Sequence, residues 1–348
     1  MPCSTRHPLA CFVPPDLLRD VIVQGDAADR QAALDSLLID SAIRTMRAEN
    51  AARTIAPLQR LGAGAGKSQR FIHDQRHGSS MTPGPVIRAE GQPVVADATV
   101  NQAYDGFGDT YRFYWEVLQR DSIDDQGMPI HGLMHFDNSY NNAFWDGAGH
   151  MFFGDGDGRL FLDFTKGTDV IGHELTHGVT QYTANLVYSG ESGALNESIS
   201  DVFGSMIKQY ALGQTVDQAD WLIGADVVGP ELEHALRSMK EPGTANKYDH
   251  QPSDMDGYVV TIRDHGGVHT NSGIPNRAFY LAAAGIGGKS WEKAGSIWYA
   301  ALNDATLTPN TRFKGFAHAT IQAAKSAYGP TSAPAKAVTD AWRTVKVL

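Results

Sequence analysis

The segment His173-Glu-Leu-Thr-His177 constrains the fold of this 348-residue chain more than any other feature of its sequence. On an α-helix the two histidines lie on one face, one turn apart. Two imidazoles placed in this way can both bind a zinc ion, and Glu174 beside them can act as general base on a metal-bound water. The alternative is two surface histidines on an amphipathic helix. The spacing therefore predicts a helix over residues 168–183 and makes a zinc site the hypothesis to test.

A second segment offers the third ligand that a catalytic zinc requires beside one open position. Glu197 and Asp201 lie four residues apart on a helix predicted over residues 193–212. Glu197 can bind the metal, and Asp201 can accept the free ring N–H of a ligating histidine. Taken alone, such a pair is typical of a solvated helix face. Because it follows a zinc-binding helix, it favours metal ligation. The longer metzincin motif is absent, since Thr180 and Thr183 replace its Gly and His.

The segments 170–184 and 188–201 resemble the two zinc segments of the thermolysin family of zinc metallopeptidases, which are gluzincins. The resemblance covers residues 85–348, and it also rests on four shorter segments, at 141–147, 154–158, 235–239 and 264–273. It implies an α+β fold with a zinc site in the cleft between two domains. The β-rich N-terminal catalytic domain would span 61–184 and end in the His-Glu-x-x-His helix. The α-helical C-terminal catalytic domain would span 185–348.

Local sequence patterns agree with this two-part plan. Short apolar runs separated by turn residues predict a β-rich region over 86–165, and the Gly-Asp-Gly-Asp-Gly run at 154–158 predicts a hairpin turn. From residue 168 onward the patterns become helical. Beyond the two helices already named, they predict helices at residues 273–285, 290–306, 311–328 and 334–345.

The resemblance implies one zinc ion per chain. His173, His177 and Glu197 would hold it, and Asn196 and Asp201 would support these ligands from behind.

The resemblance also implies a zinc-dependent endopeptidase, a neutral metalloprotease. Glu174 would take a proton from the zinc-bound water as it attacks a peptide carbonyl, and would pass it to the leaving amine. Tyr188 and His269 would donate to the oxyanion that forms, and Asp264 would orient His269.

Peptide and protein substrates would bind along the cleft as an added edge strand, at the segment that contains Asn142 and Ala143. Arg237 would reach a substrate carbonyl on the primed side. The first primed-side pocket would be lined by Phe161, Phe164, Val170 and Leu236. An apolar pocket of this kind implies cleavage on the N-terminal side of large hydrophobic residues. The alternative for these four residues is plain core packing.

Residues 1–60 differ from the rest of the chain. The first 66 residues hold seven arginines and seven acidic residues, so the net charge of −10 lies entirely in the remainder. The segment 11–18 contains Pro14-Pro15 and resembles the short pro-segment of the protealysin-like subgroup. This implies a precursor in which residues 1–60 form a removable propeptide that inhibits its own catalytic part. The Gly-Ala run after Leu61 favours a linker, with cleavage within residues 50–70. The alternative is a permanent docking helix, and a helix is predicted over 16–49.

Composition excludes several classes of protein. A chain with this net negative charge is not a general nucleic-acid binder, and no run of about 18 apolar residues predicts a membrane span. The only cysteines, Cys3 and Cys11, cannot form a disulfide framework for the main body. We find no signal-peptide pattern, which favours a cytoplasmic precursor or export by another route, whereas the family habit favours secretion.

Calcium is a second metal to consider, because members of the family often bind it near the zinc helices. Asp169, Asp220 and Asp226 stand at suitable positions. Lys208 stands where the family often has an acidic ligand, and its ammonium can neutralise the three carboxylates in place of an ion. The double calcium site is therefore doubtful. A calcium loop at 154–158 is less favoured than a turn.

Two other functions fit parts of the pattern. A zinc-dependent peptide-binding or adhesion protein without turnover would be expected to lack Glu174, Tyr188 or His269, and all three are present. A gluzincin aminopeptidase would need an acidic motif that grips the substrate N-terminus, and we find none.

Overall fold

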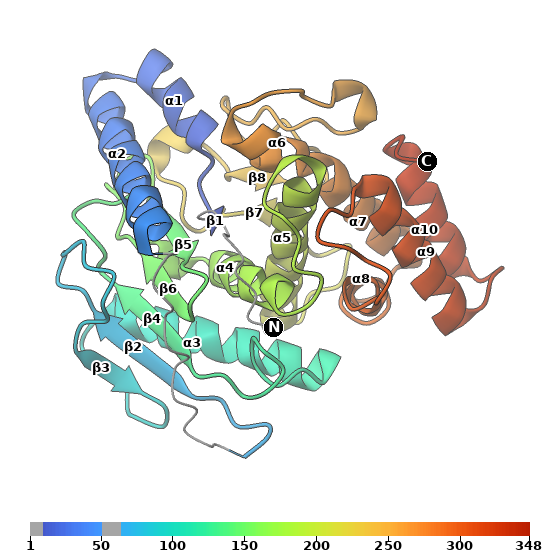
Figure 1. Ribbon diagram of the computed structural model, residues 1–348, viewed down its shortest axis with the longest axis horizontal. Helices are drawn as coiled ribbons and strands as arrows, with labels where there is room; N and C mark the ends of the chain where they lie inside the picture. The colour runs from blue at the N-terminus through green and yellow to red at the C-terminus, as the bar shows by residue number, and fades with distance from the viewer. Residues whose placement is uncertain (1–9, 51–63) are drawn as a thin grey trace.

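The structure is a computed structural model that describes residues 10–50 and 64–348. Its first part contains a sheet, and its second part is helical (Figure 1). Cys3 and most of the expected cleavage region lie outside the described residues. Within them, no helix is long and apolar enough to cross a membrane.

A six-stranded sheet organises the first part, and its central strands are parallel. Strand β4 (Ile130–Met134) pairs in parallel with β2 (Arg70–Asp74) on one side and β6 (His150–Phe153) on the other. Strands β3 (Val86–Ala89) and β5 (Ala143–Trp145) add antiparallel pairs at the outer sides of β2 and β6. The final edge strand, β1 (Ala10–Cys11), comes from the N-terminal segment and pairs antiparallel with β5. The N-terminal segment is thus built into the sheet that residues 70–153 form.

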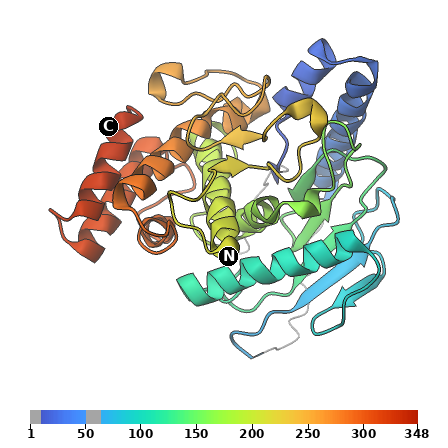
Figure 2. The ribbon, with the colours of Figure 1, turned by 180° about the vertical axis from the view of Figure 1, so that it is seen from behind.

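A long helix lies within the region predicted to be β-rich, so that prediction is wrong for these residues. Helix α3 (Ala98–Arg112) continues into a π-helical turn, Phe113–Val117, and packs on β2 and β4 (Figure 2). Its first turn is capped by Asp97, whose carboxylate accepts the Val100 N–H. Buried residues recur along it with helical spacing, at Val100, Ala103, Tyr104, Phe107 and Tyr111.

The segment 154–158 is not a hairpin turn, which corrects another prediction. The residues after it pair with Val228 through Phe161 rather than folding back on β6. The Asp157 carboxylate accepts the backbone N–H groups of Arg159 and Leu160, both at 2.8 Å. Its backbone N–H bonds the Asn141 side chain at 2.9 Å. The bond to Asn141 connects the loop to the segment before β5. Contacts between separate segments therefore outweigh the local turn signal.

Two helices cross the centre of the molecule and carry the motif residues. They are α4 (Thr168–Gln181) and α5 (Gly190–Leu212), and most of their residues are buried. Each packs against the other, and α4 also contacts β5. The predicted helices at 168–183 and 193–212 are confirmed with small changes at their ends.

The second part adds a short ribbon of β7 (Leu222–Ile223) and β8 (Arg237–Ser238), and five helices. The helices are α6 (Asp264–Asn271), α7 (Gly273–Ile286), α8 (Ala294–Leu302), α9 (Phe313–Tyr328) and α10 (Ala333–Thr344). Single 3-10 turns at Pro230–Leu232 and Met255–Gly257 lie between these elements, and another, at Phe164–Lys166, precedes α4. Helix α6 was not predicted. The other four match the prediction, although α8 is shorter than residues 290–306.

The N-terminal segment forms two helices rather than the single helix predicted over 16–49. They are α1 (Pro15–Gln24) and α2 (Ala27–Asn50). The break falls at Gly25 and Asp26, where the Asp26 carboxylate accepts the N–H groups of Ala28 and Asp29 at 2.8 and 2.9 Å. A side chain that caps a new helix competes with continuation of the old one, and this explains the break.

Candidate active site

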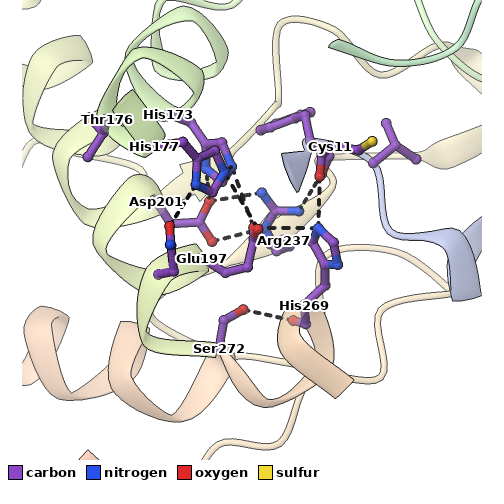
Figure 3. A network of polar contacts seen from close by, with 12 residues as sticks. Cys11, His173, Thr176, His177, Glu197, Asp201, Arg237, His269 and Ser272 are labelled. Carbon is purple, nitrogen blue, oxygen red and sulfur yellow. Dashed lines mark hydrogen bonds and ion pairs between the residues drawn. The ribbon is translucent and has the colours of Figure 1, made fainter. Parts of the chain in front are cut away.

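Helices α4 and α5 bring three potential metal ligands together in the buried centre of the molecule. His173 and His177 project from α4, and Glu197 projects from α5 (Figure 3). One ligand atom of each residue lies within 4.8 Å of the others, and all three side chains are buried. The Glu197 carboxylate oxygens lie 3.5 Å from the Nε2 atoms of both histidines. The structure therefore assembles the predicted group.

The hydrogen bonds around these residues favour a cation between them. His173 Nδ1 lies 2.8 Å from Asp201 Oδ1, and His177 Nδ1 lies 2.8 Å from Asn196 Oδ1. These acceptors hold a proton on each Nδ1. A neutral imidazole with its proton on Nδ1 keeps a lone pair on Nε2, and the two Nε2 atoms face each other 3.0 Å apart. Two facing lone pairs repel, and a bound metal ion removes that repulsion. Glu197 Oε2 has no hydrogen-bond partner among the described residues.

The charges around the group maintain the same protonation states. Burial lowers the pKa of His177 to about 4, which keeps the ring neutral and able to bind a metal. Burial opposes the charge on Asp201, but Arg237 and His173 outweigh it and hold the pKa of Asp201 below its usual range. Arg237 donates to both Asp201 oxygens, at 3.0 and 2.8 Å. Zinc, with its preference for imidazole and carboxylate ligands, fits this donor set.

Glu174 lies on α4 next to the ligands and is fully buried. Burial and the nearby Glu197 charge raise the pKa of Glu174 well above its ordinary value. The Trp145 backbone offsets this in part, yet neither Glu174 oxygen makes a hydrogen bond within the described residues. A buried carboxyl without a partner is costly, and such groups occur where a substrate or water supplies the missing contact.

His269 and Asp264 lie on α6, opposite the two central helices. Asp264 Oδ1 lies 2.7 Å from His269 Nδ1, and Asp264 Oδ2 accepts the His269 backbone N–H at 2.8 Å. Burial works against a charge on His269, but the Asp264 and Glu197 carboxylates raise its pKa to about 9. The Tyr188 hydroxyl donates to Glu197 and lies 3.3 Å from His269 Nε2. All of these groups are buried around one point.

The N-terminal segment passes through this site. The Cys11 carbonyl lies 2.8 Å from His269 Nε2, and the Phe12 N–H donates to the Ala143 carbonyl at 3.0 Å. The Arg237 guanidinium donates to the Phe12 carbonyl at 3.0 Å. The Asn142 side chain accepts the Val13 N–H at 2.8 Å. The predicted substrate-binding residues Asn142, Ala143 and Arg237 therefore all contact the chain's own N-terminal segment.

The Phe12 ring occupies an apolar pocket beside the histidines. Its centroid lies 5.2 Å from the His173 ring and 6.3 Å from the Phe164 ring, in edge-on contacts. The Phe164 ring in turn packs 5.3 Å from Phe161. Val170 and Leu236 belong to the same buried cluster as Phe12. The four predicted pocket residues thus lie in one core, and Phe164 contacts the aromatic ring that fills it.

Sequence reasoning missed two residues at this position. Phe12 was not singled out, although an aromatic residue shortly before Pro14-Pro15 is a visible signal. Gly224 was also missed. A Cβ there would come within 3.1 Å of Phe12 and 3.2 Å of Leu236, and its φ of +73° favours glycine. Nothing local in the sequence indicates that Gly224 borders the pocket.

A second charged cluster lies farther along the same two helices. The Lys208 ammonium of α5 lies 4.0 Å from Asp169 and 3.4 Å from both Asp220 and Asp226. Asp169 is fully buried at the start of α4, where its oxygens also accept the N–H groups of Val170 and Gly224. The predicted neutralisation of the three carboxylates by Lys208 is confirmed in its geometry.

Comparisons with known proteins find relatives over nearly the whole chain. Two family models, described as the catalytic domain and the alpha-helical domain of thermolysin metallopeptidase, match residues 64–181 and 184–347. An extracellular metalloprotease of Pectobacterium carotovorum is 47% identical over 98% of this chain and 97% of its own length. Protease PrtS of Photorhabdus is 40% identical over 97% of this chain and 91% of its own length.

A solved structure is similar over nearly the whole chain. The precursor of protealysin, a metalloproteinase from Serratia proteamaculans, superposes with a TM-score of 0.87 at 43% identity. The match covers 97% of this chain and 100% of that one. It confirms the predicted α+β, thermolysin-like architecture and the resemblance to the protealysin-like subgroup. On these matches and the geometry of its site, the chain belongs to the thermolysin family of zinc metallopeptidases.

Proposed function

We propose that this zinc-dependent endopeptidase cleaves peptide bonds on the N-terminal side of large hydrophobic residues, with Glu174 as its general base. The observation that carries the proposal is the position of Phe12. An extended chain places an aromatic side chain in the apolar pocket, and its preceding carbonyl, from Cys11, bonds His269. A substrate bound in the same way would present the carbonyl to be attacked at this position.

The metal and Glu174 divide the first step between them. When bound by His173, His177 and Glu197, zinc would polarise the substrate carbonyl and acidify water. Glu174 would accept the proton of the attacking water and deliver it to the leaving amine nitrogen. Its place on α4 beside His173 supports this role, and neither of its buried oxygens makes a hydrogen bond to the described residues.

Three further residues would stabilise the oxyanion that forms at the attacked carbonyl. His269, with a pKa raised to about 9, would donate from Nε2, and Tyr188 would donate from its hydroxyl. Asp264 would orient the His269 ring and stabilise its positive charge through the 2.7 Å bond to Nδ1.

The substrate backbone would be held by strand addition to β5. The Ala143 carbonyl and the Asn142 side-chain amide would bond the backbone around the pocket residue, and Arg237 would bond that residue's carbonyl. The bonds that these groups make to Phe12 and Val13 support the assignment. Phe161, Phe164, Val170 and Leu236 would line the pocket.

The test of the general base is Glu174→Gln, with Glu241→Gln on the exposed surface as the matched control. We expect Glu174→Gln to retain one zinc per chain and to lose about 10²–10⁴-fold in kcat on a quenched fluorescent peptide. Near-normal turnover by the zinc-loaded variant would remove Glu174 from this role. No turnover by wild type freed of its N-terminal segment would favour a binding protein instead.

The test of specificity uses peptides that differ only at the residue after the cleaved bond. We expect kcat/KM for Phe or Leu to exceed that for Gly by about 10-fold or more, because an apolar pocket discriminates by buried area. Equal rates would contradict the assignment of the pocket.

We also propose that residues 1–60 are a removable propeptide that blocks the cleft, ahead of catalytic domains at 61–184 and 185–348. Three groups of contacts support this. Strand β1 occupies the edge of β5, and Phe12 fills the pocket. The buried Asp40 accepts the Tyr140 hydroxyl at 2.5 Å. Arg159 pairs with Asp26 at 2.8 Å and Asp29 at 2.9 Å.

Phe12→Ala tests the inhibition. We expect the full-length precursor of this variant to cleave a small peptide at least about 10-fold faster than the wild-type precursor, since it loses a buried aromatic anchor. Val23→Ala on α1, where the side chain is 72% exposed, is the control. Intact mass must show that both precursors remain uncut during the assay. Equal rates for the two uncut precursors would contradict a blocking role for Phe12.

A further inference from the structure

Three potential metal ligands lie together at one edge of the sheet, away from the candidate active site. His77 follows strand β2, His135 directly follows β4, and Asp155 follows β6. These strands are parallel neighbours, so their carboxyl ends meet at the same edge. The carboxyl ends of parallel strands are where loops converge to form binding sites.

The side chains of this group face one another at short range. One ligand atom from each lies within 4.8 Å of the others. His135 Nδ1 lies 2.9 Å from both oxygens of Asp155, and His77 Nδ1 lies 3.4 Å from Asp155 Oδ2. The backbone fixes the two histidines relative to each other, because the His77 N–H donates to the His135 carbonyl at 2.9 Å.

A fourth residue orients the central histidine. Asp97, the N-cap of α3, lies with Oδ2 2.9 Å from His135 Nε2. A carboxylate that accepts the second ring N–H of a histidine fixes its tautomer and strengthens it as a metal ligand. His135 would then present its Nδ1 lone pair towards Asp155 and His77, which is the side where the other ligand atoms lie.

We propose that His77, His135 and Asp155 form a second metal site, specific for zinc and similar first-row transition ions and independent of the candidate active site. Two imidazoles and one carboxylate suit Zn²⁺ or Co²⁺, whereas Ca²⁺ requires more oxygen ligands. Binding replaces the proton on His135 Nδ1 with the metal, and the proton passes to solvent. In the absence of metal, the same geometry is an ion pair of His135 with two carboxylates.

The site is open to ions from solvent. The His77 side chain is 53% exposed, and those of His135 and Asp155 are 17% and 25% exposed. Water molecules can complete the coordination on the His77 side. This exposure distinguishes the site from the fully buried group of His173, His177 and Glu197.

The site also adjoins the strand edge that holds the N-terminal segment. The backbone N–H groups on either side of Asp155 bond the segment before β5, from Gly154 to Asn142 at 3.0 Å and from Gly156 to Tyr140 at 3.2 Å. A metal that fixes Asp155 would therefore tie this segment to β2 and β4. We expect it to stabilise the fold rather than to take part in peptide cleavage.

The experiment uses the full-length chain without a polyhistidine tag, with one zinc already bound per chain. Equilibrium dialysis at pH 8 against micromolar Zn²⁺, and separately Co²⁺, measures bound metal by mass spectrometry. We expect a second equivalent in wild type and in the exposed-surface control His318→Ala. We expect only one equivalent in His77→Ala, whose exposed side chain makes loss of the fold a minor risk, and in Asp155→Asn.

Two further readouts separate a metal site from an ion pair. Asp97→Asn should bind the second metal about 10–100-fold more weakly, since it weakens the support of His135. Saturating zinc should raise the unfolding temperature of wild type by a few degrees more than that of His77→Ala. A single equivalent in wild type at 100 μM metal, or a second equivalent retained by His77→Ala, would overturn the proposal and leave the ion pair alone.

Discussion

Two clusters on the same pair of helices handle buried charge in different ways. The metal group lies midway along α4 and α5, where His173, His177 and Glu197 converge. The Lys208 cluster lies at the start of α4 and towards the end of α5. In the first, two imidazole nitrogens face each other beside a carboxylate oxygen that accepts no hydrogen bond from the described residues. In the second, an ammonium already stands among three carboxylates.

The difference shows that a pair of helices can either form a site that requires a metal ion or supply a lysine ammonium in place of the ion. Behind the metal group, the Arg237 guanidinium bonds Asp201 rather than the ligand atoms. Lys208 reaches its carboxylates directly, and they raise its pKa to about 12 against the effect of burial. One cluster therefore depends on zinc from solution, and the other is complete within the chain.

The largest effect should follow removal of the metal. Dialysis against 1,10-phenanthroline should reduce peptide hydrolysis by at least about 10³-fold, because both the polarised carbonyl and the acidified water are lost. One equivalent of Zn²⁺ should restore the rate, and millimolar Ca²⁺ should not. Restoration by calcium alone would contradict the division between the two clusters.

Lys208→Met should have the next largest effect. Three carboxylates would lose the positive charge that neutralises them. Buried Asp169 could then lose its own charge only by binding a proton, and burial already raises its pKa in that direction. We expect a loss of about 2 kcal/mol in the free energy of unfolding, because Asp220 and Asp226 are half exposed. Lys336→Met on the exposed face of α10 is the control, and urea unfolding at pH 7 is the measurement. Equal free energies of unfolding for the two variants would mean that Lys208 does not stabilise the fold by neutralising these carboxylates.

Lys208→Glu converts the second cluster into a test of ion dependence. Four carboxylates then face one another, which is the oxygen-rich arrangement that calcium binds. Without calcium the variant should melt below wild type, and millimolar calcium should raise its melting temperature by several degrees while leaving wild type unchanged. If calcium shifts neither protein, the remaining carboxylates are wrongly placed to bind it.

The smallest effect concerns histidines that have neither a metal nor a carboxylate partner. His131 lies 3.0 Å from His73, and burial together with the His73 and His150 charges lowers the pKa of His131 to about 4. Between pH 6.5 and pH 4 the unfolded chain binds a proton that the folded chain does not, so stability falls as the pH falls. His131→Gln should reduce the loss between pH 7 and pH 5 by about 1 kcal/mol, after allowance for partial exposure. Urea unfolding at both pH values, with His318→Gln as control, measures this. An unchanged loss would show that His131 is charged in the folded chain.

Much of the metal group was predictable because its residues lie on helices with fixed spacing. The turn between His173 and His177, and the turn between Glu197 and Asp201, place ligands and support without knowledge of the tertiary structure. His269, Tyr188 and Asp264 came only from the family resemblance, since no helical spacing links them to the two motifs. Their proposed roles remain predictions for mutagenesis to test.

The failures have a common cause in contacts between distant segments. The loop at 154–158 was predicted to be a hairpin turn because its local turn signal is strong. In the structure, Asp157 of this loop instead hydrogen-bonds the Asn141 side chain through both its carboxylate and its backbone N–H. Phe12 looked unremarkable because its partners, His173, Phe164 and Arg237, are more than 150 residues away. Helix α3, in contrast, carried a helical pattern and an Asp97 cap that could have been recognised.

The most direct test of the account is the intact mass of the purified chain beside Glu174→Ala, after incubation of both with zinc. If the chain is a latent peptidase that removes its own N-terminal segment with Glu174 as general base, wild type should lose a fragment that ends within residues 50–70. Its peptide-cleaving activity should rise at the same time. Glu174→Ala should bind zinc and stay at full length. Equal processing of the purified mutant, or full peptidase activity from a wild-type chain that stays uncut, would contradict the account.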